Sequence, residues 1–148
     1  LIIGSGTRKK YLEQLVIDYG LNNIIIKDQL PRADYQELVC NADVGLISLN
    51  EKFTIPNIPS KTLSYFNAKV PILAAIDANT DYGKILELSG SGLWSVTGAI
   101  KKYKDNFERL YNEPVLRTQM GENGYAYLVR HLTPEMAYNT MVNTINGT

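Results

Sequence analysis

Hydrophobic residues along this chain follow two alternating patterns. Short, uninterrupted apolar runs predict buried strands, whereas apolar residues that recur every three or four positions predict amphipathic helices. We expect strands at residues 1–3, 23–27, 43–49, 71–76 and 92–96. We expect helices at the apolar stripes, which cover residues 12–19, 35–42, 60–68, 81–88 and 100–111. Gly20 is the predicted stop of the first helix, and residues 50–58 follow neither pattern and predict a loop.

The order of these elements indicates a fold class. Strands that alternate with helices and are apolar throughout are typical of a parallel sheet covered on both faces. We therefore predict an α/β fold with a Rossmann-like, doubly wound parallel sheet of about five strands. After residue 97 we expect two closing helices over 113–131 and 133–145, the second with Thr133 as its N-cap and Pro134 at its first position. No repeat or linker interrupts residues 1–148, which predicts a single domain.

Composition and charge narrow the class of protein. Fifteen Lys and Arg residues balance fifteen Asp and Glu residues, so the whole chain has no electrostatic footprint for nucleic acid or an anionic membrane, which leaves only a local patch as an alternative. Cys40 is the only cysteine, which excludes an internal disulfide and a zinc site built on cysteines. No apolar run approaches the ~20 residues that a membrane-spanning helix needs, and we expect a cytoplasmic protein. The chain begins without methionine, inside the apolar run Leu1–Ile3, which we interpret as the interior of a longer protein.

Candidate binding segments lie where predicted strands end. In open parallel sheets, ligands bind outside the carboxyl ends of the strands, where loops meet helix N-termini. The turn Gly4-Ser5-Gly6 follows the first strand, and its glycines permit a close approach to the backbone. An ordinary strand-to-helix turn is the alternative interpretation, because Lys9 stands where a complete dinucleotide fingerprint has its third glycine.

Two further turns are candidates for the same reason. Residues 27–32 (KDQLPR) lead from a strand into a helix, where backbone groups can read a planar base and Leu30 can pack on it. Pro59 suits the first turn of the next helix, and residues 60–62 present backbone N–H groups, hydroxyls and an ammonium that suit a diphosphate. An ordinary capped helix with a solvated lysine is the alternative here.

Other reactive residues have structural interpretations. His131, the only histidine, lies near the end of a late helix, and Cys40 lies beside the apolar face of its helix. We expect a surface or packing role for His131 and burial of Cys40. Asp77 follows a strand and is expected to cap the next turn. No two carboxylates form the close pair that hydrolytic acid–base chemistry requires, and the sequence assigns no residue to a catalytic role.

In order and spacing, these segments resemble the C-terminal, nucleotide-binding domain of the family 4 glycosyltransferases, which have the two-domain GT-B architecture. Residues 1–49 are similar to that family's strand, Gly-x-Gly turn, Leu-Glu helix, strand, Pro-Arg turn and Ala-Asp-Val strand. PSKTLSYFNAKVPILA, at 59–74, resembles the donor-site helix, commonly written P-S-K-x-x-E-Y-M-A-x-G-x-P-V. EPVLRTQMGENGYAYL, followed by HLTPE, is similar to the family's late pair of helices. The resemblance covers nearly the whole chain.

The resemblance implies a function and a set of binding residues. The family transfers a sugar, with retention of configuration, from a nucleoside diphosphate sugar to an acceptor, without a metal or another cofactor. The implied substrate-binding residues are Gly4, Ser5, Gly6, Lys27, Asp28, Leu30, Ile58, Pro59, Ser60, Lys61 and Ser64. The family commonly has glutamates where Pro56 and Ser64 stand here, and a glycine where Lys69 stands.

The resemblance also implies partners and a location. The acceptor would be a glycan or a lipid-linked sugar, held by an N-terminal domain outside this sequence, and nucleic acid is not an expected partner. Bacterial surface polysaccharide synthesis is the expected pathway, in the cytoplasm at the inner face of the membrane, with peripheral membrane contact. We expect residues 1–148 alone to be inactive. Two alternatives stay open: a nucleoside diphosphate sugar 2-epimerase, and a non-catalytic nucleotide-binding module, which the residues Pro56 and Ser64 favour.

Overall fold

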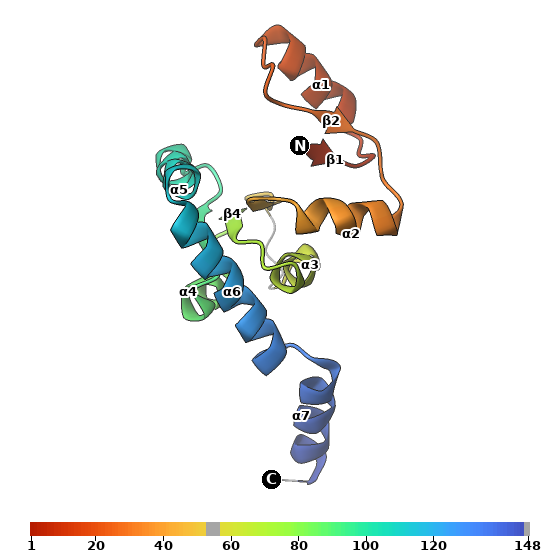
Figure 1. The fold of residues 1–148 in the computed structure, drawn as a ribbon, viewed down its shortest axis with the longest axis vertical. Helices are drawn as coiled ribbons and strands as arrows, with labels where there is room; N and C mark the ends of the chain where they lie inside the picture. Colours follow the sequence, from red (N-terminus) through yellow and green to blue (C-terminus); the bar gives the residue numbers. More distant parts are fainter. Residues whose placement is uncertain (53–56, 147–148) are drawn as a thin grey trace. The chain divides into compact units, whose positions relative to one another are not determined.

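The computed structural model describes residues 1–52 and 57–146 (Figure 1). The chain divides into two compact units, Leu1–Leu38 and Val39–Thr148, and each is described by itself. Pro56, where the resembled family has a glutamate, lies outside the described residues. The expectation of a single domain over residues 1–148 stays a prediction.

The first unit is built on a short parallel pair of strands. β1 (Ile2–Ile3) pairs in parallel with β2 (Ile26–Lys27), and α1 (Lys9–Asp18) connects them. α2 (Arg32–Cys40) follows β2 and continues into the second unit. None of residues 1–38 is fully buried, so this unit has little apolar burial to stabilise it.

The end of α1 confirms the predicted role of Gly20. The φ of this glycine is +61°, in the left-handed region that favours glycine. Its N–H bonds to the carbonyl of Ile17 at 3.0 Å, and the N–H of Leu21 bonds to the carbonyl of Val16 at 2.9 Å. These two bonds form a Schellman motif, which satisfies carbonyls that a helix end otherwise leaves without a partner.

The second unit contains a three-stranded parallel sheet. β3 (Gly45–Ser48), β4 (Ile72–Ile76) and β5 (Gly92–Val96) lie in that order, so β4 pairs on both sides. α3 (Lys61–Asn67) connects β3 to β4, and α4 (Tyr82–Ser89) connects β4 to β5. Three consecutive side chains of β4 are completely buried, as a strand covered on both faces requires: Ile72, Leu73 and Ala74.

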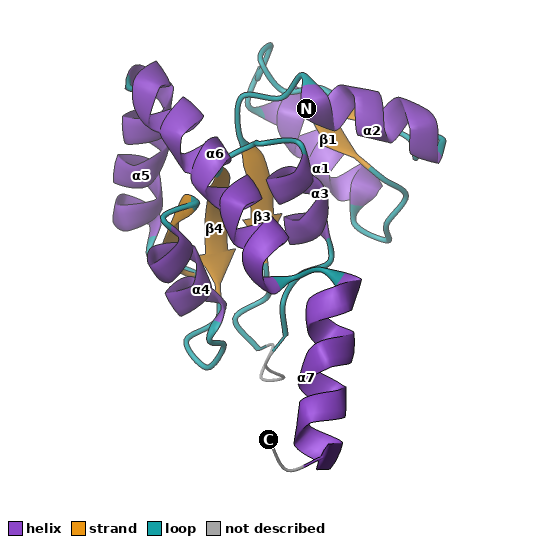
Figure 2. Cartoon of the chain, turned by 60° about the horizontal axis from the view of Figure 1, so that its bottom comes forward, coloured by secondary structure: helices purple, strands orange, loops and turns teal. Residues whose placement is uncertain are grey.

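Two hydrophobic clusters cover the two faces of this sheet. Successive side chains of a strand point to opposite faces. On one face, β4 packs against α3 and α4. On the other face, Leu73 packs with Leu110 of α5 (Ile100–Asn112) and Met120 of α6 (Pro114–His131). Helices therefore cover both faces of the sheet in this unit, as the sequence predicts (Figure 2).

α6 approaches the segment before β4 so closely that one of its positions requires glycine. A Cβ at Gly121 would lie 2.0 Å from the carbonyl oxygen of Lys69. Lys69 itself has a φ of +57°, the left-handed conformation in which the resembled family has glycine. Its ammonium pairs with Glu122 at 3.0 Å and lies 5.1 Å from the centroid of the Tyr125 ring. Lys69, which follows the end of α3 in a strained left-handed conformation, is thus held by two side chains of α6.

α7 (Pro134–Asn146) is the last described element. The hydroxyl of Thr133 accepts the N–H of Met136 at 3.3 Å, and Pro134 is the first helical residue, so the predicted N-cap is confirmed. None of its described side chains is fully buried. Across residues 1–52 and 57–146, no helix combines the length and the apolar character needed to cross a bilayer.

The prediction of one five-stranded sheet is wrong. The strands of the described residues form separate sheets of two and three strands. The apolar run at 23–27 contributes only Ile26 and Lys27 to a strand, while Ile24 and Ile25 are exposed. A two-residue strand forms few ladder hydrogen bonds, and hydrophobic periodicity carries no information about which strand edges pair.

Candidate functional site

Two predicted segments lie side by side at the carboxyl ends of β1 and β2. The turn Gly4-Ser5-Gly6 follows β1, and residues 27–30 begin in the last residue of β2. The N–H of Gly4 bonds to the carbonyl of Lys27 at 3.1 Å, and the hydroxyl of Ser5 donates to the side-chain oxygen of Gln29 at 3.5 Å. The first unit therefore brings both segments together, because the carboxyl ends of parallel strands meet at one edge.

The glycines of this turn have open surroundings. A Cβ on Gly4 or on Gly6 would meet no atom within 4 Å. The φ of Gly4 is +151°, which other residues rarely adopt, so backbone conformation explains this glycine. Gly6 has neither a positive φ nor a crowding neighbour. The described surroundings of Gly6 therefore give no steric or conformational reason for a glycine at this position.

Lys9 binds the carboxylate of Asp28 beside this turn. Its Nζ lies 2.5 Å from Oδ1 of Asp28 and 3.2 Å from Oε1 of Glu13. The hydrogen bond to Asp28 raises the pKa of Lys9 above its usual value of 10.5. Asp28 is thus paired with a cation, while Leu30 is half-buried and Lys27 is exposed.

The predicted diphosphate-binding segment leads into α3. Ser60 precedes the helix with φ −57° and ψ −28°, and its hydroxyl makes no capping bond. Among the described residues, neither this hydroxyl nor the ammonium of Lys61 has a hydrogen bond or an ion pair. The exposed members of the segment are Ile58, Ser60 and Lys61, and the half-buried members are Pro59 and Ser64. The segment therefore presents an unpaired cation and a free hydroxyl to solvent.

A buried hydrogen bond fastens α3 to α4. The hydroxyls of Thr62 and Tyr82 lie 2.7 Å apart, and both residues are almost completely buried. Burial raises the pKa of the Tyr82 phenol well above its usual value of 10.0, so this hydroxyl stays protonated at neutral pH. Thr80 accepts the N–H of Tyr82 at 3.3 Å and donates to the carbonyl of Asn57 at 3.4 Å. Sequence reasoning missed these supports, which hold the start of α3 against the turn after β4.

The carboxyl ends of β3, β4 and β5 are also tied to one another. Asp77, buried at the end of β4, accepts the N–H groups of Asn79 and Thr80 at 2.8 and 3.0 Å, which confirms the predicted cap. Thr97, after β5, donates its hydroxyl to the carbonyl of Leu49, after β3, at 2.8 Å. These bonds join the strand ends at this edge of the sheet, and Thr80 links the edge to Asn57, next to Ile58 and Pro59.

His131 and Cys40 lie outside these groups of residues. The imidazole of His131 stacks on the ring of Tyr127 with centroids 4.6 Å apart, which confirms its packing role. Cys40 is exposed, so its expected burial is wrong, because it lies beside the apolar stripe of α2 rather than within it. In the described part of the chain, no cluster of three or more His, Cys, Asp or Glu residues could hold a metal ion.

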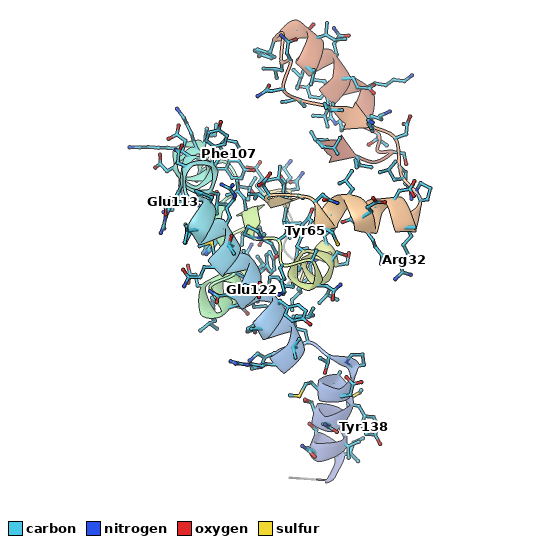
Figure 3. The ribbon with its side chains drawn as sticks, viewed as in Figure 1. Arg32, Tyr65, Phe107, Glu113, Glu122 and Tyr138 are labelled. Atoms are coloured by element: carbon cyan, nitrogen blue, oxygen red, sulfur yellow. The ribbon has the colours of Figure 1, made fainter. Side chains whose placement is uncertain are left out.

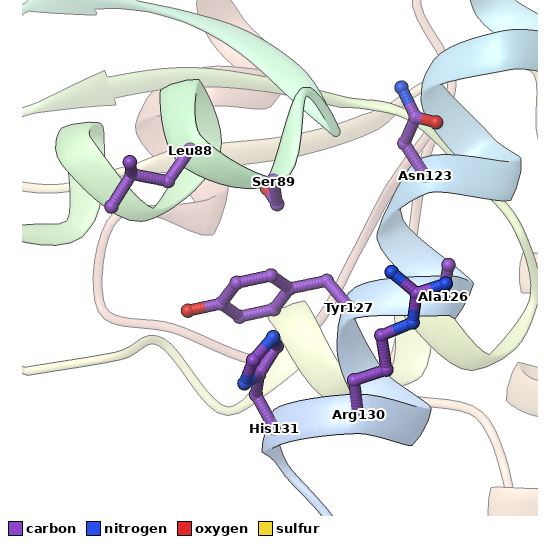
Figure 4. Close-up of a pocket in the computed structure, with 7 residues that line it drawn as sticks. All are labelled: Leu88, Ser89, Asn123, Ala126, Tyr127, Arg130 and His131. Atoms are coloured by element: carbon purple, nitrogen blue, oxygen red, sulfur yellow. The ribbon is translucent and has the colours of Figure 1, made fainter.

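A hollow of about 350 Å³ lies between the ends of α4 and α6 (Figure 4). Two of its polar side chains are engaged, because Asn123 donates to the carbonyl of Gly90 at 3.1 Å and Ser89 donates to the carbonyl of Ile85 at 2.7 Å. α4 runs back from the end of β4 to the start of β5, so the hollow lies at the amino edge of the three-stranded sheet, opposite the edge at which residues 58–61 lie. Its lining consists of Leu88, Ser89, Asn123, Ala126, Tyr127, Arg130 and His131.

Comparison with known proteins gives a likeness in fold. No family model matches the chain, and no curated protein sequence matches it significantly. Its structure superposes with a TM-score of 0.68 on WaaG, a glycosyltransferase involved in lipopolysaccharide biosynthesis. The chain has the fold of part of a glycosyltransferase. The two sequences are 18% identical, and the superposition covers 99% of this chain and 37% of the WaaG chain. The likeness at this identity establishes the fold alone.

The predicted substrate-binding residues thus fall into one group in each unit. Residues 4–6 and 27–30 form the first group, at the ends of β1 and β2. Residues 58–61 and Ser64 form the second, supported by the turn after β4. That one ligand contacts both groups stays a prediction.

Proposed function

We propose that this chain is the donor-binding half of a retaining glycosyltransferase of GT-B architecture and binds a nucleoside diphosphate sugar. The observation that carries the proposal is the placement of the predicted residues. In each unit they lie beyond the carboxyl ends of parallel strands, where α/β proteins bind ligands. The likeness in fold to WaaG supports the same class of protein.

In this proposal the two groups of residues hold different parts of the donor. Residues 4–6 admit the donor close to the backbone, and residues 27–30 face the base, with Leu30 packed on its ring. The N–H groups of Ser60 and Lys61 and the Lys61 ammonium bind the diphosphate. Ser64 lies one helical turn after Ser60 and contacts the ribose. No side chain is assigned as a nucleophile or a base.

Lys61 has the chemistry to assist transfer as well as binding. When the sugar leaves, the bond between its anomeric carbon and the diphosphate oxygen breaks, and negative charge grows on the diphosphate. A cation held against that charge stabilises the transition state more than the ground state. Lys61 has no ion-pair partner in the described ranges, and the neighbouring Thr62 is fixed by Tyr82. The helix therefore presents this ammonium without competition from a carboxylate.

The whole protein would supply what this chain lacks. The chain spans little more than a third of the WaaG chain, and we propose that a further domain binds an acceptor glycan or lipid-linked sugar. The product would belong to a bacterial surface polysaccharide made at the cytoplasmic face of the membrane. Residues 1–148 alone should bind the donor without transferring its sugar.

Amide chemical shifts of the 148-residue chain test the proposal. We would titrate the chain with UDP-, GDP-, ADP- and dTDP-sugars and expect Gly4, Gly6, Ser60 and Lys61 to shift together for the preferred base. Lys61→Ala should weaken binding about tenfold or more, because a charge-assisted hydrogen bond contributes ~1.5–3 kcal/mol. Shift changes confined to α6 and α7 would contradict the proposal.

Arg130→Ala is the matched control. Arg130 is an exposed cation that lines the hollow between α4 and α6, and it has no ion pair among the described residues. Its replacement removes the same charge as Lys61→Ala and should leave nucleotide binding unchanged. If Arg130→Ala abolished binding and Lys61→Ala did not, the nucleotide would occupy the hollow and the proposal would fall.

Ser64 favours a second candidate function, a nucleotide-binding module without catalysis. This residue is half-buried on α3 and offers one neutral hydroxyl where the resembled family has a carboxylate. A looser hold on the ribose would suit a sensor as well as an enzyme. The full-length protein separates the two: transfer of sugar from the bound donor to an acceptor identifies the enzyme, whereas binding with no transfer identifies the module. The epimerase alternative gains no support, because the one histidine stacks on Tyr127 at the amino edge of the sheet.

A further inference from the structure

The hollow between the ends of α4 and α6 is lined by hydrogen-bond donors that the fold does not engage (Figure 4). The guanidinium of Arg130, the phenol of Tyr127 and the imidazole of His131 all line it. Among residues 1–52 and 57–146, none of these three groups has a hydrogen bond or an ion pair, although the two rings stack on each other. Their hydrogen-bonding capacity is therefore available to a ligand.

Hydrogen-bond acceptors border the same hollow, because two helices end there. The last carbonyls of a helix have no partner within it. At the end of α4, the N–H groups of the next two residues bond to the carbonyls of Leu86 and Glu87. The carbonyls of Leu88 and Ser89, two residues that line the hollow, remain without a partner inside the helix. α6 ends beside them at His131, so the hollow combines donors with helix-end carbonyls.

The charges around the hollow favour a ligand without net charge. Each helix end carries partial negative charge, which stabilises Arg130 in the last turn of α6 but disfavours a bound anion. The guanidinium of Arg130 in turn disfavours a bound cation. The acidic residues next to the lining in sequence are engaged elsewhere: Glu87 accepts the indole N–H of Trp94 at 2.9 Å, and Glu122 pairs with Lys69 at 3.0 Å.

We propose that this hollow binds a neutral saccharide, a monosaccharide or a disaccharide. Each hydroxyl of a sugar both donates and accepts hydrogen bonds, which suits a lining that offers side-chain donors and helix-end carbonyls together. The ring of Tyr127, which extends across the hollow in Figure 4, provides an apolar surface for the C–H groups of a sugar ring. The volume of about 350 Å³ is that of a small ligand pocket.

This saccharide site is separate from the proposed donor site. The hollow lies at the amino edge of the three-stranded sheet, opposite the edge at which residues 58–61 lie. The inference rests on the proposed function only for its purpose, because an enzyme that extends a glycan gains from holding a unit of that glycan away from the reacting end. The binding itself needs only α4 and α6.

Amide chemical shifts of the 148-residue chain test the inference. We would titrate the chain with methyl α-glucoside, methyl α-mannoside, methyl β-galactoside, N-acetylglucosamine, maltose and lactose. At least one of these should shift Ser89, Ala126 and Tyr127, with a dissociation constant of about a millimolar, as expected for a ligand of this size. Inorganic phosphate should leave the same amides unchanged, because two helix ends disfavour an anion.

Three variants of the lining should weaken saccharide binding. Arg130→Ala removes a charged donor and should weaken it about fivefold or more. Tyr127→Phe keeps the ring and removes one hydroxyl, so it should weaken binding about threefold or more. Ala126→Phe fills the hollow and should abolish binding. Thermal melts of each variant show whether it is folded, and Arg130→Ala changes an exposed side chain that the fold does not need.

Two exposed residues outside the hollow provide matched controls (Figure 3). Arg32 lies on α2, is exposed and has no ion pair among the described residues. Tyr138 lies on α7 and is 64% exposed. Arg32→Ala and Tyr138→Phe remove the same groups as Arg130→Ala and Tyr127→Phe, and they should leave saccharide binding unchanged.

The outcomes separate this inference from the proposed function. No shift at the hollow with any of the six sugars, or equal affinities of Arg130→Ala and Arg32→Ala, would overturn it. Shifts confined to residues 58–64 would assign the sugar to the donor site and overturn it as well. Phosphate binding that Arg130→Ala abolishes would overturn it in favour of an anion site.

Titration with UDP, GDP, ADP and dTDP, which carry no donor sugar, reports on the donor site independently. Nucleotide binding without saccharide binding at the hollow refutes only this inference. Saccharide binding at the hollow without binding of any of the four nucleotides refutes only the proposed donor site.

Discussion

At Gly121 the backbone of α6 meets the backbone of the segment before β4. A Cβ there would lie 2.0 Å from the Lys69 carbonyl oxygen and 2.7 Å from its carbonyl carbon, and neither atom can rotate away. We expect Gly121→Ala to lower the free energy of unfolding by about 1–3 kcal/mol despite the better helix propensity of alanine. Urea denaturation measures this. Gln119→Ala, at an exposed position of the same helix, is the control and should stay within about 0.5 kcal/mol of the original chain.

Lys69 has an unfavourable backbone conformation, and the contacts of its side chain compensate for it. Its φ of +57° disfavours any residue with a Cβ, while Glu122 and Tyr125 hold the ammonium. Alanine would lose these contacts and keep the strain, whereas glycine would lose the contacts and relieve the strain. We expect Lys69→Gly to be about 1 kcal/mol more stable than Lys69→Ala. Equal stabilities in thermal or urea denaturation would mean that the left-handed conformation is not maintained at this helix end.

The connection between α3 and α4 depends on the Thr62–Tyr82 hydrogen bond, which the fold buries completely. Removing one hydroxyl leaves the other buried without a partner, so Tyr82→Phe and Thr62→Val should each cost about 1–3 kcal/mol. The double variant leaves neither group unsatisfied and should cost less than the sum of the two, by about 1 kcal/mol or more. Tyr111→Phe, at an exposed tyrosine, should have little effect. Additive losses in the double variant would show that the two hydroxyls are not coupled.

Tyr82 also makes the free energy of unfolding depend on pH in the alkaline range. Burial raises the pKa of Tyr82 and of Tyr103 above the usual value of 10.0, so the folded chain holds these protons more tightly than the unfolded chain. Their contribution to stability is therefore complete below pH 10 and is lost as the pH rises above it. We expect the free energy of unfolding to fall less steeply above pH 10 in Tyr82→Phe than in the original chain. Urea titrations from about pH 8 to about pH 11 compare the two slopes; identical slopes would refute the assignment to Tyr82.

Helices and helix ends are the features that the sequence predicts best. Gly20 and Thr133 act through bonds to residues a few positions away, so local rules locate both ends correctly. The Thr62–Tyr82 bond joins residues 20 positions apart and follows no period, which is why sequence reasoning missed it. Residues 23–27 have the composition of a strand, yet only Ile26 and Lys27 form one, because strand formation depends on a partner edge that the local sequence does not specify.

In the candidate site, too, some features follow from the sequence and others depend on contacts between distant residues. The Gly4 turn and residues 27–30 come together because consecutive parallel strands bring their carboxyl ends to one edge, which follows from the order of elements. The ion pair of Lys9 with Asp28 could not be predicted, because it depends on the rotation of α1 above the strand pair. The hydrogen bond from Thr80 to Asn57 similarly joins two loops that carry no pattern.

The two units differ in how much of their surface folding buries. No residue of the first unit is fully buried, whereas the second has a strand with three consecutive side chains at 0% exposure. Local stability follows apolar burial, so the first unit should open at a lower free energy than the sheet of the second. Hydrogen exchange of the free chain should therefore show weaker protection of the amides in β1 and β2 than of those in β4.

Donor binding should raise the exchange protection of the first unit towards that of the second. In the proposed function the donor contacts both groups of predicted residues, one in each unit. A ligand that binds only the folded state stabilises it by RT ln(1 + [L]/Kd), which is about 2.7 kcal/mol when its concentration is a hundred times Kd. If the ligand contacts residues 4–6 and 27–30, opening of the first unit must release it, and exchange of β1 and β2 should slow by about a hundredfold. If the ligand contacts only residues 58–61 and Ser64, exchange in the first unit should not change while α3 gains protection.

Exchange measured with and without the preferred nucleoside diphosphate distinguishes these outcomes. Lys61→Ala should lower the protection of both units together, by about tenfold at the same ligand concentration, if one donor molecule engages both groups of residues.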